Sequence, residues 1–184
     1  MSSWINVIAF QTGWFASILS AANGMPWIAA IAALAVAAFH LASARHPGEE
    51  FKLMLAAPLL GALWENSLAL AGWTGFSGGV LIERTAPLWM VAQWAMFATT
   101  LNLSLSWLKG RLFLAALFGA VGAPLSYTAG ERLGAIQILD RESALTALAI
   151  GWAVLTPLLL LLARRWNGYA VGVKPLPITK VHHA

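Results

Sequence analysis

The chain has 184 residues, of which 60% are hydrophobic and only 10% carry a charge. Its mean hydropathy is +0.75. Soluble domains carry about 25% charged residues, so this composition excludes an ordinary soluble protein and indicates a membrane protein. The chain has no cysteine, which excludes disulfides and Cys-ligated metals. Loop bases beside lipid head groups account for the net charge of +4, and we expect membrane lipids, not nucleic acid, as partners.

Charged residues are absent from four long blocks, which locate the transmembrane helices. A helix needs about 20 apolar residues to cross the hydrocarbon, and turn residues at 23–26 divide the first block. We predict an all-α polytopic membrane protein, with six transmembrane helices in one compact bundle and a single domain over residues 1–184. The expected spans are about 4–22, 25–43, 51–73, 87–108, 112–129 and 143–163.

The basic residues predict the orientation. With six spans, both ends of the chain lie on one side of the membrane, and that side carries eight of the eleven bases: Arg45, Lys52, Lys109, Arg111, Arg164, Arg165, Lys174 and Lys180. The other side carries Arg84, Arg132 and Arg141. The positive-inside rule then places both termini in the cytoplasm, with residues 164–184 as a cytoplasmic tail.

Polar residues in the first two spans suggest helix contacts more than catalysis. In the first span a stripe of small and polar residues shares one face, while Gln11 points elsewhere; the stripe is Asn6, Ala9, Gly13, Ser17 and Ser20. In the second span His40 lies near the cytoplasmic end, where a lone imidazole is more often a hydrogen-bonding group than a ligand. The membrane segments contain no pair of histidines spaced to hold a metal or haem, so we expect no cofactor.

Glu65 and Asn66 interrupt the third span. Glu65 lies 8 residues before Trp73, a residue of the outer interface, which places it roughly 12 Å below that interface. Its helical face otherwise carries small residues that allow another helix to approach closely: Pro58, Gly61, Ala69 and Gly72. Because an ionisable group at mid-depth costs about 2.5 to 3.5 kcal/mol on insertion scales, we expect Glu65 to face the bundle interior.

Gln93 in the fourth span is the expected partner of Glu65. It lies at nearly the same depth, and we predict a hydrogen bond between the two side chains. Asn102 lies on the opposite face of this span, so the span should be central, with neighbours on two sides. Burial and the lack of a deep cation favour a neutral Glu65 carboxyl. It serves either as a hydrogen-bonding staple between helices or as a proton or ligand site.

The fifth span carries a second group of polar residues beside Pro124. The proline frees a backbone carbonyl, which Ser126 or Tyr127 could satisfy. Glu131 and Arg132 follow at the outer interface. Two interpretations are open: a kinked helix with an ion pair of Glu131 and Arg132 at its mouth that lines a pocket, or an ordinary proline kink with these two residues as capping charges. Residues 133–139 are expected along the membrane surface, with Asp140 as the cap of the sixth helix.

Two short segments resemble each other in the first and fourth spans. "QTGWFAS" from Gln11 and "QWAMFAT" from Gln93 share the glutamine and the Phe-Ala pair that follows. Repeats offset by three spans would be inverted across the membrane, as in some transporters. A 3+3 inverted repeat is therefore one explanation of the match, and chance is the other.

Three motifs together resemble a known family. "FQTGWF", "PLWMVAQWAMFATTLNLSLSWL" and "APLSYTAGERLGA", with the Glu65-Asn66 pair, are similar to bacterial inner-membrane proteins grouped as domain of unknown function 2878 (DUF2878). The resemblance extends from the first span into the sixth. It implies a multi-span protein of the bacterial inner membrane and carries over no catalytic residue.

Three kinds of function remain open from the sequence. The first is non-enzymatic binding or transport of a lipid or small molecule, with the candidate binding residues Gln11, Glu65, Asn66, Gln93, Ser126 and Tyr127. The second is a membrane enzyme acting on lipid, which needs acid-base groups near one interface, where Tyr127, Glu131, Arg132 or His40 lie. The third is an accessory subunit of a membrane complex. We favour binding or transport.

Overall fold

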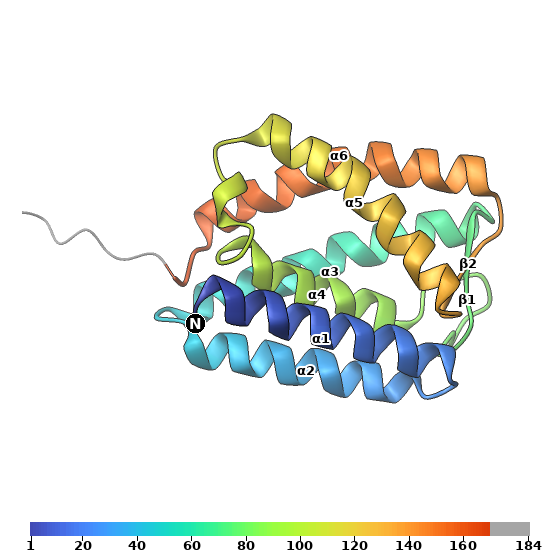
Figure 1. Cartoon of the computed structure of the whole chain (residues 1–184), viewed down its shortest axis with the longest axis horizontal. Coiled ribbons are helices and arrows are strands. Elements are labelled where there is room, and N and C mark those ends of the chain that lie inside the picture. Colours follow the sequence, from blue (N-terminus) through green and yellow to red (C-terminus); the bar gives the residue numbers. More distant parts are fainter. Residues whose placement is uncertain (170–184) are drawn as a thin grey trace, which may run out of the picture.

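The structure, a computed structural model, describes residues 1–169 (Figure 1). The helices are α1 (Ser3–Ala22), α2 (Pro26–Ser43), α3 (Pro47–Leu70), α4 (Leu88–Leu101), α5 (Leu112–Arg132) and α6 (Arg141–Arg165), with a short 3-10 helix η1 (Ser106–Leu108). Two strands, β1 (Thr74–Phe76) and β2 (Ile136–Ile138), complete the elements. Most of the predicted cytoplasmic tail, including Lys174 and Lys180, lies outside the described residues.

Five helices, all except α4, are long and apolar enough to cross a membrane. Their outer faces keep large apolar side chains exposed, such as Leu34 at 69%, Leu59 at 69% and Val154 at 63%. Soluble proteins rarely expose apolar surface on this scale. Lipid is therefore the solvent of these faces, and the chain is a multi-pass membrane protein with an all-α fold.

The fourth helix is shorter than the predicted span 87–108. It has 14 residues and ends at Leu101, so it rises only about 21 Å. Near its end the Thr99 hydroxyl donates to the Met96 carbonyl, and the Thr100 hydroxyl donates to the Phe97 carbonyl. Such side-chain bonds compete with continued helix, and the chain then turns through residues 102–105 into η1.

The helices lie side by side in three pairs (Figure 1), with α1–α2 and α5–α6 on either side of α3–α4. The α4 helix contacts α1, α2, α3 and α6, which confirms its predicted central position. The N-terminus and the end of α6 lie at one end of the bundle, opposite β1 and β2. We call these the terminal end and the β end.

The helix pairings differ between the two halves of the chain. An inverted repeat of three helices would pair α4 with α5 in the way that α1 pairs with α2. Instead, α4 packs along α3, and α5 packs along α6. The packing therefore gives the expected repeat no support.

Residues 133–139, which we expected along the membrane surface, include β2. This strand pairs with β1 in an antiparallel ribbon, with Gly75 opposite Gln137. The ribbon satisfies backbone groups that an extended segment in lipid would leave unpaired. Asp140 caps α6 as predicted, because its side chain accepts a hydrogen bond from the Ser143 amide.

A close contact between α3 and α4 confirms the role predicted for the small residues beside Glu65. The indole ring of Trp94 lies directly on the α3 backbone at Gly61. A Cβ atom added to Gly61 would lie 2.3 Å from Trp94 Cγ, much closer than van der Waals contact. Only glycine therefore admits the ring at this position.

We expect Gly61→Ala to destabilise the bundle, because its methyl group overlaps the Trp94 ring. Overpacking of this kind costs about 1 to 3 kcal/mol. The unfolding temperature of detergent-solubilised protein measures the effect. The matched control is Gly48→Ala in the first turn of α3, where an added Cβ meets nothing within 4 Å. Equal unfolding temperatures for the two variants would contradict the packing argument.

Candidate functional site

A cavity of about 480 Å³ lies inside the bundle. The α1, α3, α4, α5 and α6 helices and β2 contribute its walls, which are mostly aromatic and aliphatic. Five of the six predicted binding residues border this cavity: Gln11, Glu65, Gln93, Ser126 and Tyr127. Residues from separate helices thus meet at one place in the fold.

Glu65 is the polar centre of the cavity and is fully buried. Its Oε1 accepts a hydrogen bond of 3.0 Å from the Trp94 indole nitrogen, and its Oε2 accepts one from the Tyr127 hydroxyl. These bonds connect α3 to α4 and α5. The predicted partner Gln93 was wrong, because the adjacent Trp94 is the residue that points at the carboxyl group.

Gln93 has a different place in the cavity. Its side chain is 9% exposed and borders the cavity, and within the described residues its Oε1 has no hydrogen-bond partner. A buried amide oxygen without a partner is uncommon in folded proteins. Gln93 therefore offers hydrogen-bonding capacity beside the Glu65 group.

Gly61 explains how Trp94 reaches Glu65. The two α3 residues are one helical turn apart on the same face. With the Trp94 ring seated on Gly61, its N–H lies at the level of the Glu65 carboxyl. Tyr127 lies on α5 one turn after Pro124. From the sequence we considered that its hydroxyl could satisfy the backbone carbonyl freed by the proline, but the hydroxyl donates to Glu65 instead.

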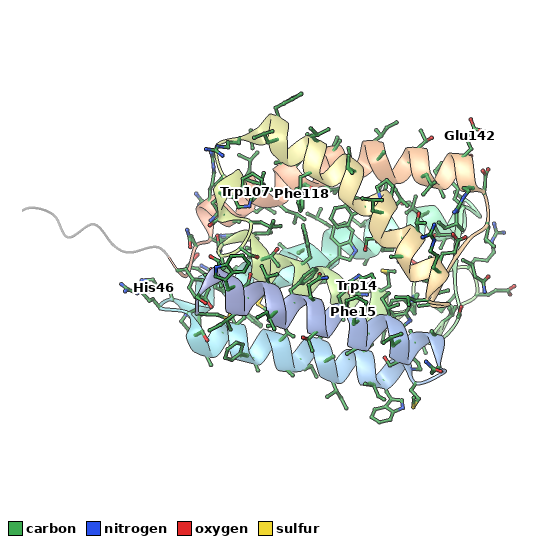
Figure 2. All side chains as sticks on the ribbon, in the orientation of Figure 1. Trp14, Phe15, His46, Trp107, Phe118 and Glu142 are labelled. Atoms are coloured by element: carbon green, nitrogen blue, oxygen red, sulfur yellow. The ribbon has the colours of Figure 1, made fainter. Side chains whose placement is uncertain are left out.

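The cavity opens between α1 and α5. Two of its aromatic residues, Phe15 on α1 and Phe118 on α5, are 46% and 42% exposed, and Leu125 on α5 is 64% exposed. Figure 2 marks Phe15 and Phe118 on the helices that border the opening. Since these faces contact lipid, the opening leads sideways into the membrane.

At the β end the cavity is closed by tight packing. Ile18 of α1 and Ile136 of β2 are both buried, and both side chains lie against Gly130 of α5. The β1–β2 ribbon holds Ile136 in this position. Access from the β end is thus restricted, and the lateral opening is the route that the geometry favours.

The sixth predicted binding residue lies apart from the cavity. The Asn66 side-chain nitrogen donates to the Ala62 carbonyl, and its oxygen accepts from the Ala86 amide. Asn66 therefore anchors the loop that leads into α4. The ion pair between Glu131 and Arg132, one of the two interpretations of the sequence, is not formed: Arg141 pairs with Glu131 at 2.9 Å, because the turn before α6 brings it alongside.

A second buried carboxyl group, that of Glu50, lies towards the terminal end. His40 Nε2 lies 2.7 Å from Glu50 Oε2, and Glu50 Oε1 accepts bonds from the Asn102 side chain and the Gly168 amide, each 2.6 Å long. The Lys109 ammonium donates to Asn102 Oδ1. This group connects α2, α3, the end of α4 and the chain after α6.

Sequence reasoning missed Glu50, although it placed His40 correctly as a hydrogen-bonding residue. Glu50 stands beside Glu49 and Lys52, whose side chains form an exposed ion pair, and the cluster resembles a solvated loop. Helical spacing was the available signal. Glu50 and Glu65 are about four turns apart and share the face of α3 that is directed at α4.

An apolar layer separates the two carboxyl groups. On α3 it contains Leu53 and Ala57, and on α4 it contains Ala98 and Leu101, all fully buried. These residues pack into one hydrophobic cluster. The Glu65 cavity and the Glu50 group are therefore distinct sites, not parts of one polar channel.

A comparison with known protein families identifies the family of the chain. The profile of a family described as protein of unknown function (DUF2878) matches residues 3–158. The chain belongs to this family. The match includes α1 to α5 and most of α6, so it covers all residues that border the cavity. No curated protein and no solved structure matched the chain.

We predict that Glu65→Ala lowers the unfolding temperature in detergent more than Glu65→Gln. Alanine leaves the Trp94 and Tyr127 donors unsatisfied, at about 0.6 to 2 kcal/mol in membrane settings. Glutamine keeps an oxygen for the Trp94 N–H, and its amide can donate to the Tyr127 oxygen. An equal loss of stability in both variants would show that the carboxyl charge, and not the hydrogen bonding, holds the helices.

A pH effect is expected from Lys109, in the loop between α4 and α5. Burial lowers the pKa of Lys109 from 10.5 to about 8, with the nearby Glu50 opposing and Arg164 adding to the change. Between these two pH values the unfolded chain binds a proton that the folded protein has released, so stability from this group rises with pH.

Lys109→Met removes the titrating group and serves as the comparison. As pH rises from about 8 to 10.5, the unfolding temperature of the wild type should increase relative to that of the variant. Both proteins are measured in the same detergent at each pH, so other titrations cancel. A constant or decreasing difference would contradict the prediction.

Proposed function

We propose that the protein binds a lipid-like or other amphiphilic small molecule in the cavity between α1 and α5, as a binding or transport protein. We place it in the inner membrane of a bacterium, with both termini in the cytoplasm. The observation that carries the proposal is a cavity that opens to lipid and has a fixed polar group inside.

The cavity has the features of small-molecule sites. Such sites are mostly apolar, with a few polar groups that fix the orientation of the ligand. Here aromatic side chains such as Trp14, Phe97 and Phe118 provide the apolar wall, and Glu65 and Gln93 provide the polar groups. An amphiphile entering from the membrane would keep its apolar part in hydrocarbon throughout.

An enzyme acting on lipid is less well supported. The residues considered for acid-base chemistry are dispersed: Tyr127 bonds to Glu65 inside the cavity, and Glu131 pairs with Arg141 on the surface. His40 is fully buried beside Glu50 towards the terminal end. General acid-base catalysis needs such groups within hydrogen-bonding reach of one substrate, and these residues do not share a site.

Filling the cavity tests the proposal. An added Cβ at Gly122 meets nothing within 4 Å, although the residue borders the cavity. Gly122→Phe should therefore fold and occupy the cavity. The wild type, purified in mild detergent, should retain an amphiphile that mass spectrometry of the extracted material detects, and Gly122→Phe should lose most of it.

Val121→Phe is the matched control, since Val121 is 52% exposed and lies outside the cavity lining. It adds a phenyl ring to the adjacent α5 position, on the lipid side, and should retain the amphiphile. Unfolding temperatures show that both variants are folded. A wild type with no enriched amphiphile, or equal amounts in all three proteins, would reject the binding function and favour an accessory subunit.

A further inference from the structure

The charges around the cavity are unbalanced. Glu65 is the one acidic residue in the cavity lining, and no Lys, Arg or His of the described residues borders it. Lys109, the lysine of the Glu50 group, is separated from Glu65 by the apolar layer. Within low-dielectric surroundings an ionised carboxylate strongly favours a partner of opposite charge.

The donors around Glu65 suit the ionised form of the carboxyl group. The Trp94 indole N–H can only donate, and the Tyr127 hydroxyl is placed at the other carboxyl oxygen. One donor at each oxygen supports negative charge on a fully buried side chain. These two hydrogen bonds lower the cost of ionising Glu65, and no cationic side chain of residues 1–169 borders it. The carboxyl group, expected to be neutral in the empty cavity, therefore becomes a carboxylate when a cation binds beside it.

Aromatic rings continue from this carboxylate along the cavity wall. The Trp94 and Trp152 ring centroids are 4.7 Å apart, those of Phe97 and Trp152 are 5.3 Å apart, and those of Phe10 and Phe97 are 6.4 Å apart. The faces of such rings attract cations, most strongly where water is excluded. The carboxylate and the aromatic wall therefore favour the same kind of ligand.

We propose that the cavity selects lipophilic cations, such as amines or quaternary onium compounds carrying large apolar groups. Their positive charge lies between Glu65 and the aromatic wall, and their apolar groups fill the space towards the α1–α5 opening. Gln93, with its unpartnered oxygen, accepts a hydrogen bond where the cation carries an N–H. This inference rests on the proposed binding function and specifies the charge of the ligand.

Three probes of one shape and different charge test the selection. Tetraphenylphosphonium is a cation, tetraphenylborate is an anion and tetraphenylsilane is neutral. Each is added to detergent-solubilised protein, and the amount that co-elutes in size exclusion is measured by mass spectrometry, with empty micelles as the blank. The wild type should retain the phosphonium best and the borate least.

Glu65→Gln removes the charge and keeps the hydrogen bonds. It should weaken phosphonium binding about tenfold to a hundredfold, since a hydrogen bond or contact to a charged group contributes about 1.5 to 3 kcal/mol, and should leave silane binding unchanged. Gly122→Phe should abolish the binding of every probe, and Val121→Phe should abolish none.

The outcomes separate this inference from the binding function. Phosphonium and silane binding of equal strength, or phosphonium binding that survives Glu65→Gln, would overturn the charge selection and leave an uncharged amphiphile as the ligand. Probe binding that persists in Gly122→Phe, or its absence from the wild type, would overturn the cavity as a binding site and with it both proposals.

Discussion

Two carboxyl groups that α3 removes completely from water, those of Glu50 and Glu65, are the constraint on which the bundle depends. A buried carboxyl group without hydrogen-bond donors is costly, and α3 cannot supply these donors itself. Glu65 obtains them from α4 and α5, and Glu50 obtains them from α2, the end of α4 and the chain after α6. The positions of these elements are thus fixed relative to one helix.

The same constraint explains why a cavity persists in the bundle. Tyr127 fixes α5 by its bond to Glu65, and Gly119 lets the backbones of α5 and α6 approach, since an added Cβ would lie 2.2 Å from the Trp152 carbonyl oxygen. Both contacts draw α5 away from α1. Ile18 of α1 packs at Gly130 of α5 together with Ile136 of β2, and the cavity lies between the two helices further along.

The sequence predicts the positions of the helices better than the contacts between their side chains. Helix positions follow from gaps in charge, because the thickness of the hydrocarbon sets the length of each span. The choice of Gln93 over Trp94 failed for a geometric reason. Adjacent residues on a helix have nearly the same depth but point about 100° apart, so depth alone cannot choose between them. The end of α4 depends on threonine hydroxyls whose rotamers a sequence does not show.

The apolar layer between Glu65 and Glu50 has a consequence for the membrane as a whole. A cell that stores energy as a proton gradient loses it through any continuous file of water or hydroxyl groups. Hydrocarbon side chains such as Leu53 and Leu101 pack between the two carboxyl groups and offer a proton no acceptor, while the nearby Thr99 and Thr100 hydroxyls donate to backbone carbonyls of their own helix. The protein can keep an ionisable group deep in the bilayer and still insulate one compartment from the other.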